Sequence, residues 1–243
     1  MVPSGEFLKG CQIGCLRVSD LLDFAAESRK AWLSDDSVEI VLSVIQTRYS
    51  GQGCQVLMYG QQFWLAFTAS FLTKQIDMLL TRVVEEYHSG RQHSGIQDGI
   101  EKIMFPLLYQ SHWYAICICF KSCEIQFAEG FNERAPPPEL YKTILFFLEM
   151  IGVEKREWRV VRWIAPGQCD GYSCGPVALF VMEEWYGNRK IGDWKGRSPK
   201  NRLRYVRMVV ELHYQNGIDG EVVVVDVERE NEELKVCSVW LCP

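Results

Sequence analysis

The sequence lacks any long apolar run and any excess of positive charge. No stretch of its 243 residues approaches the roughly 20 apolar residues that a membrane-spanning helix needs, so no membrane segment is predicted. The formal net charge of -5 gives no basic field that could hold a phosphate backbone, which argues against nucleic acid as a partner. The first 25 residues contain acids and no continuous apolar segment before a cleavage site. We therefore expect an intracellular protein of the nucleus or cytoplasm, in a reducing compartment.

Histidine is scarce, and the cysteines are not spaced for a metal. Four histidines accompany ten cysteines, and no paired Cys-x-x-Cys knuckles occur among them. Structural zinc sites usually combine four ligands at such tight spacing. The sequence therefore predicts neither a metal nor another cofactor. Repeats, low-complexity tracts and long linkers are also absent, so we expect one domain over residues 1–243 that acts as a monomer.

Apolar periodicity and turn residues predict interleaved helices and strands. Helical patterns cover residues 32–49, 72–84, 136–152 and 199–214, and a further helix begins at Gly175 and Pro176, before the apolar run 177–182. Strand patterns cover residues 103–108, 112–120, 124–128, 158–164, 221–226 and 234–241. The second of these is apolar on both faces, which is typical of a strand in the middle of a sheet. The fold class is therefore α+β.

Cys174 has the local context of a nucleophile. It lies just before Gly175 and Pro176, at the start of a predicted helix. Unpaired amides and the positive end of the helix dipole favour thiolate over thiol there, and the same amides can donate to an oxyanion. The competing interpretation is a small buried hydrophobic residue, which is the common fate of a free cysteine.

His112 is the histidine placed to serve as a base. It begins the buried strand beside Trp113, where an imidazole can reach a cleft. If the following hairpin turns between Phe120 and Lys121, Glu129 lies directly opposite His112 and can orient the ring. A register shift of two residues keeps both side chains on one face, whereas an odd-length loop separates them. Otherwise Glu129 is an ordinary solvent-facing glutamate.

These residues resemble the ubiquitin-like-protein-specific (SUMO) cysteine proteases, which are related to the adenovirus protease. The resemblance spans about residues 30–215 and leaves 216–243 as an additional tail. It rests on four motifs in order: Trp32-Leu-Ser-Asp35 before a helix, Ile103-Met-Phe-Pro106 leading to His112-Trp113, the strand ending at Glu129, and Gln168 to Gly175. The intervals are 17 positions from His112 to Glu129 and six from Gln168 to Cys174.

The resemblance implies a papain-like SUMO-protease fold, a central mixed sheet flanked by helices. By the same resemblance, Cys174, His112 and Glu129 match the catalytic triad, Gln168 the oxyanion glutamine, and the Gly175 amide adds to the oxyanion site. Trp32 and Trp113 match tryptophans that enclose the modifier's Gly-Gly tail, and Asp35 matches a residue that touches the modifier.

The implied activity is cleavage after the Gly-Gly tail of a ubiquitin-like modifier, with a SUMO-like modifier favoured, in precursors or conjugates. The implied partner is that modifier or its conjugate. Two positions depart from the pattern, because the family usually has aspartate where this chain has Glu129 and Ser173. Glutamate in the triad also occurs in the related bacterial effector acetyltransferases. An acetyltransferase and a catalytically silent modifier-binding module therefore stay open as alternatives.

Overall fold

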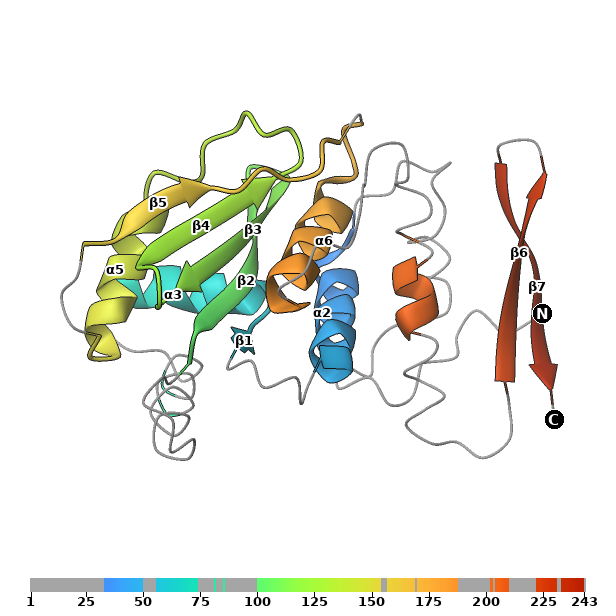
Figure 1. Cartoon of the computed structure of the whole chain (residues 1–243), viewed down its shortest axis with the longest axis horizontal. Helices are drawn as coiled ribbons and strands as arrows, with labels where there is room; N and C mark the ends of the chain where they lie inside the picture. Colours follow the sequence, from blue (N-terminus) through green and yellow to red (C-terminus); the bar gives the residue numbers. More distant parts are fainter. Residues whose placement is uncertain are drawn as a thin grey trace.

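The structure is a computed structural model. It describes residues 33–49, 56–73, 81, 85, 100–153, 157–168, 170–187, 202, 204–209, 222–230 and 233–242, the last two ranges as strands only. Its centre is a five-stranded mixed sheet with helices on both faces (Figure 1), which confirms the predicted α+β class. In the described part of the chain, no helix is both long and apolar enough to cross a bilayer.

The sheet has the strand order β1-β2-β3-β4-β5, with antiparallel pairs at its centre and a parallel pair at each edge. Its strands are β1 (Val56–Met58), β2 (Lys102–Tyr109), β3 (His112–Cys119), β4 (Glu124–Glu129) and β5 (Arg159–Arg162). The central strand β3 is buried along almost its whole length, as its two apolar faces predict.

Two tight turns set the positions of the strand ends. Gln110 and Ser111 both have positive φ, 48° and 57°, so β2 returns into β3 through two residues and His112 follows the turn at once. The next hairpin turns later than predicted. Cys119 pairs with Glu124, because the four residues 120–123 form the turn and Cys123 takes a φ of 54°.

Of the two registers that keep both side chains on one face, the structure therefore has the shifted one and not the direct pairing of His112 with Glu129. Glu129 lies opposite Tyr114, two residues further along β3. Relative to direct opposition, the pairing of the strands shifts by two residues, so Glu129 and His112 remain on the same face as diagonal neighbours.

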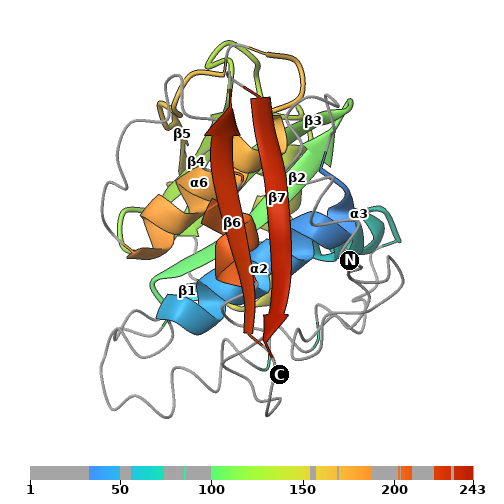
Figure 2. The same ribbon diagram turned by 90° about the vertical axis from the view of Figure 1, so that its right-hand side faces the viewer.

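The helices divide the core into two apolar clusters, one on each face of the sheet. On one face, α2 (Asp35–Tyr49) and α6 (Cys174–Gly187) pack together and enclose Trp113 of β3. On the other face, α3 (Gln61–Thr73) and α5 (Leu140–Met150) cover Tyr114. In Figure 2 the view is turned by 90°, and α2 and α6 lie in front of the strands of the sheet.

A buried ion pair anchors α6. Glu183 of α6 is fully buried, and its carboxylate accepts hydrogen bonds from both terminal nitrogens of Arg204 and from the Tyr49 hydroxyl. Arg204 belongs to a helical segment at residues 204–209, inside the predicted helix 199–214. These contacts join α2, α6 and the segment 204–209.

Two elements, β1 and α3, were not predicted. The α3 sequence is apolar on several sides and has aromatic residues in succession, so it shows no helical periodicity. The predicted pattern 72–84 overlaps only the end of α3 and otherwise lies mostly outside the described residues.

The tail forms the predicted hairpin of β6 (Val222–Glu230) and β7 (Glu233–Cys242), a two-stranded sheet of its own.

Candidate active site

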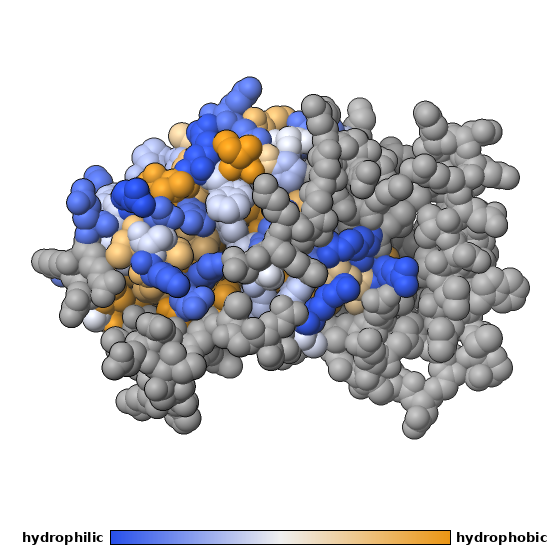
Figure 3. All heavy atoms as spheres, viewed as in Figure 1, coloured by the Kyte–Doolittle hydropathy of each residue, from blue (hydrophilic) through white to orange (hydrophobic). Residues whose placement is uncertain are grey.

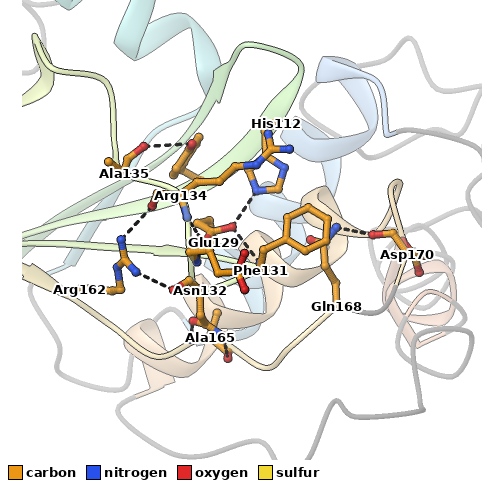
Figure 4. A network of polar contacts seen from close by, with 12 residues as sticks. His112, Glu129, Phe131, Asn132, Arg134, Ala135, Arg162, Ala165, Gln168 and Asp170 are labelled. Atoms are coloured by element: carbon orange, nitrogen blue, oxygen red, sulfur yellow. Dashed lines mark hydrogen bonds and ion pairs between the residues drawn. The ribbon is translucent and has the colours of Figure 1, made fainter.

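A buried imidazole–carboxylate pair lies where β3 begins and β4 ends. His112 Nε2 is 3.1 Å from Glu129 Oε2, and each residue is 2% exposed (Figure 4). The pair uses one ring nitrogen, so Nδ1 stays available to a second group. A carboxylate in this position fixes the tautomer of the ring and stabilises the imidazolium cation.

The loop after β4 wraps its backbone around the Glu129 carboxylate. The Phe131 amide donates to Oε2 at 2.8 Å, and the Glu133 and Arg134 amides donate to Oε1 at 2.6 and 3.0 Å. The loop can turn this tightly because Asn132 adopts a φ of 58°, which asparagine tolerates better than most residues. The glutamate side chain is longer than the aspartate that is usual at this position in SUMO proteases. The loop accommodates it by supplying hydrogen-bond donors to both carboxylate oxygens.

The surroundings of His112 favour its neutral form. Burial lowers the pKa of His112 below its ordinary value, and the charge of Arg134 lowers it further. The hydrogen bond and the charge of Glu129 act in the opposite direction, but burial is the largest cause. These surroundings therefore favour the neutral imidazole over the imidazolium cation.

Cys174 is the first residue of α6 and is 1% exposed. Backbone amides of Trp113, Gly175 and Cys174 itself lie close enough to its sulfur to favour the thiolate, which places the thiol beside the residue that follows His112. These amides lower the pKa of the thiol, but burial raises it by more, and Asp170 raises it further. The expectation of a thiolate is thus wrong, because burial outweighs the helix terminus. No hydrogen bond joins the thiol to His112 among the described residues.

The loop before α6 is organised by Asp170. Its Oδ1 accepts the amides of Tyr172 and Ser173 at 2.9 and 2.6 Å, and its Oδ2 accepts the Ser173 hydroxyl at 2.7 Å. Ser173 is completely buried. Asp170 therefore places a carboxylate close to the thiol, although the position directly before Cys174 has none.

Gln168 is held between two backbone segments. Its backbone N–H donates to the Gly130 carbonyl oxygen at 2.8 Å, and its side-chain Nε2 donates to the Asp170 carbonyl oxygen at 2.7 Å. Its Oε1 is buried without a hydrogen-bond partner in the described residues. A Cβ built on Gly130 would overlap the Gln168 side-chain amide, so this close approach requires glycine.

Asn132 connects the loop after β4 to the segment that leads to Gln168. Its Oδ1 accepts the Ala165 amide at 2.8 Å, and its Nδ2 donates to Ala165 O at 2.9 Å. Arg162 donates to the carbonyls of Asn132 and Arg134 from the adjoining strand. The segments that carry Glu129 and Gln168 are therefore joined by side-chain and backbone bonds.

The three residues predicted to bind the substrate differ in where they lie. Trp113 is buried in the core, and a Cβ on Gly175 would approach Trp113 and Leu33 to 3.1 Å each, so the helix start is packed tightly against both. Asp35 is exposed at the first turn of α2. Trp32 lies outside the described residues.

Sequence reasoning missed the residues that support the site. Asp170, Phe131, Asn132 and Arg134 act through loop geometry, which periodicity does not register. One signal was present, because Asp170 precedes Ser173 by three residues, the spacing at which aspartate accepts local amides.

Next to the site, the surface combines apolar and charged side chains. Val160, Trp163 and Ile164 are 46%, 38% and 73% exposed, on β5 and the segment that continues toward Gln168. Figure 3 shows hydrophobic and hydrophilic residues interspersed on the face that carries β5. A face of this kind offers contacts to another protein chain.

By sequence, the chain matches no family model and no curated protein. Solved structures are similar. SUMO protease Ulp1, with its catalytic cysteine oxidised to a sulfenic acid, has a TM-score of 0.59 at 14% identity, over 82% of this chain and 85% of that one. The C-terminal Ulp1 protease domain in complex with Smt3, the yeast ortholog of SUMO, has a TM-score of 0.53 at 18% identity, over 83% of each chain.

A third similar structure is the catalytic domain of a Ulp1-like SUMO protease from Chaetomium thermophilum. Its TM-score is 0.56 at 16% identity, over 79% of this chain and 75% of that one. At these identities the likeness concerns the arrangement of the backbone. The chain has the fold of the Ulp1-like SUMO proteases.

Proposed function

We propose that this chain is a cysteine protease that cleaves after the Gly-Gly tail of a ubiquitin-like modifier, in precursors or isopeptide conjugates. A SUMO-like modifier is the favoured substrate. The observation that carries the proposal is the hydrogen bond between His112 Nε2 and Glu129, which leaves Nδ1 for the Cys174 thiol beside the start of β3. The shared fold with SUMO proteases supports it.

The reaction begins from a neutral thiol and a neutral imidazole. Since burial disfavours both charged forms separately, the proton moves from Cys174 to His112 as the sulfur attacks the glycyl carbonyl. Glu129 then stabilises the imidazolium cation. The tetrahedral intermediate collapses, His112 protonates the departing amine, and water, activated by the same imidazole, releases the modifier from the sulfur.

Gln168 would stabilise the oxyanion with its second N–H. One side-chain N–H is already donated to Asp170 O, which fixes the direction of the amide. The other N–H and the amides at the start of α6 are the donors available to a developing negative charge. Because these donors are held before substrate arrives, they need no reorganisation during attack.

The proposed tail specificity comes from the resemblance to SUMO proteases, and close packing at Gly175 is consistent with it. Leu33 and Trp113 both approach this residue, so the backbone next to the nucleophile has little room for side chains. We propose that Trp113, together with Trp32, restricts the tail to glycines, and that exposed Asp35 contacts the body of the modifier.

A mechanism-based probe tests this function. We expect a SUMO-like protein with a C-terminal propargyl amide to form a covalent adduct with Cys174, located by peptide mass spectrometry. The Cys174→Ala protein is the matched control and should form none. Failure of SUMO-like and ubiquitin-like probes alike to label the folded protein would refute the protease assignment.

A second probe examines the tail. Replacing its penultimate glycine with alanine should prevent labelling, because a Cβ must pass through the narrowed space. Equal labelling by both tails would indicate an open cleft. An acetyltransferase would instead carry an acetyl thioester on Cys174, and a binding module would hold the probe without forming a covalent bond.

A further inference from the structure

An aromatic and cationic stack covers His112. The Phe131 ring lies nearly parallel to the imidazole, with a centroid distance of 5.4 Å and an interplanar angle of 18°. The Arg134 guanidinium lies over the same Phe131 ring, with Cζ 5.4 Å from its centroid. Tyr114 approaches the imidazole edge-on at 5.2 Å. Figure 4 shows Phe131 beside the imidazole, in the loop that also surrounds Glu129.

The stack restricts a motion that the hydrogen bond to Glu129 leaves open. One bond at Nε2 fixes one corner of the imidazole, but the ring can still rotate about its bond to Cβ. An aromatic face parallel to the ring limits this rotation and thereby directs Nδ1. The Phe131 amide also donates to Glu129 Oε2, the oxygen that His112 uses. Ring, carboxylate and loop are thus held as one unit.

Arg134 contributes its charge as well as its place in the stack. The charged and titratable groups that face His112 are Glu129 on β4, Arg134 on the loop and Tyr114 on β3. At neutral pH only Glu129 and Arg134 among them are charged. Arg134 therefore opposes protonation of the imidazole, whereas Glu129 favours it.

We propose that Phe131 and Arg134 are positioning residues for His112: the phenyl face sets the plane of the imidazole, and the guanidinium over the same phenyl ring places a positive charge beside the imidazole. The role in catalysis rests on the proposed function. The effect on the ring itself does not, so the two can be tested separately.

The direct test is the titration of His112 by two-bond ¹H–¹⁵N NMR, with its signals assigned by their loss in a His112→Gln protein. In the unaltered protein we expect the Nε2–H tautomer. Arg134→Gln should raise the pKa of His112, because a repelling charge is removed. Arg162→Gln is the matched control, since Arg162 holds the same loop through carbonyls, and it should leave the titration unchanged. An unaltered titration in Arg134→Gln would overturn the charge role.

The ring role is tested by Phe131→Leu and Phe131→Tyr. Leucine keeps apolar volume without a flat face, so it should lower kcat about 10- to 100-fold even at pH 8, where the imidazole is neutral, as expected when a reacting group loses its orientation. Tyrosine should restore most of kcat. Equal kcat in all three proteins, with the same NMR tautomer, would overturn the proposal.

The Arg134→Gln protein has a different kinetic signature. Its kcat at pH 8 should be close to that of the unaltered protein, whereas the acidic limb of its pH profile should move to higher pH. Arg134 is exposed, so this variant remains informative if Phe131→Leu does not fold. If the unaltered protein forms no probe adduct while the NMR shifts occur as expected, the protease assignment fails and the stack stands. Probe labelling without those shifts would instead support the protease and overturn the role of the stack.

Discussion

The two sides of the candidate site are held by different forces. On the β3–β4 side, the Glu129 carboxylate receives three backbone amides and the imidazole, so hydrogen bonds fix the base. On the α6 side, burial keeps Cys174 protonated although amides surround the sulfur. In the proposed mechanism, the proton acceptor is therefore arranged in advance, whereas the charge of the nucleophile appears only during the reaction.

The largest expected effect comes from removing the nucleophile. Cys174→Ala should abolish turnover of a SUMO-like precursor while the fold stays intact, because loss of one sulfur opens little cavity. Gel-based cleavage assays and a thermal melt by circular dichroism measure both parts. Cleavage at the rate of the unaltered protein would remove Cys174 from the mechanism.

The next effect tests the hydrogen-bonded side. Glu129→Gln replaces one carboxylate oxygen with an NH2 group, which cannot accept a hydrogen bond. We expect this NH2 group to face His112 Nε2, in place of the oxygen that now accepts from it. Nε2 must then act as the acceptor, so the ring proton moves to Nδ1. The wrong tautomer should lower kcat by about 1,000-fold or more, by analogy with the loss of a triad carboxylate.

Glu129→Asp is the matched variant, because it keeps the charge and shortens the reach. It should lower kcat by much less, about tenfold, because the imidazole keeps a charged acceptor, although at a longer distance. Both variants should be compared at several pH values. If Glu129→Gln matches the unaltered protein throughout, the working unit is a Cys174/His112 dyad.

Gln168→Ala should have an intermediate effect. Loss of one oxyanion donor lowers kcat roughly 100- to 1,000-fold. The variant also removes the contact to Asp170 O, so KM and kcat should be separated: an oxyanion donor lowers kcat and leaves KM nearly unchanged. A change confined to KM would reduce Gln168 to a loop residue.

The smallest expected effect concerns the buried thiol. Asp170→Asn keeps an acceptor for the amides of Tyr172 and Ser173 but removes the charge that raises the pKa of Cys174. The pKa of Cys174 should therefore fall, and the thiolate fraction at a fixed pH rises about tenfold for each unit by which the pKa falls. Iodoacetamide should then alkylate Cys174 about two- to fivefold faster at pH 8, because the thiolate is the form that reacts. Ser173→Ala keeps the charge and serves as control. Equal alkylation rates in Asp170→Asn and the unaltered protein would contradict an electrostatic role.

Sequence patterns predicted the framework better than the site. The central hairpins, α5 and the start of α6 follow from apolar periodicity and from turn residues, which act locally. The sequence left two registers open for Glu129, because the exact turn depended on the backbone of Cys123. The α3 helix was missed, since a segment apolar on several sides has no period to detect.

The electrostatics of the site could not be predicted for a different reason. The balance at Cys174 depends on how much protein covers the sulfur, and the amides around Glu129 depend on the path of a short loop. Both are properties of tertiary packing. Only the identity and chain order of the candidate residues were available beforehand.

The contact between Gly130 and Gln168 constrains how this sequence can diverge. No side chain fits at residue 130 while the glutamine amide occupies its present place. A relative that acquires even alanine at that position must move or replace the glutamine and, if the proposed mechanism holds, must take its oxyanion donor from another residue. Substitutions at these two positions should therefore be inherited together.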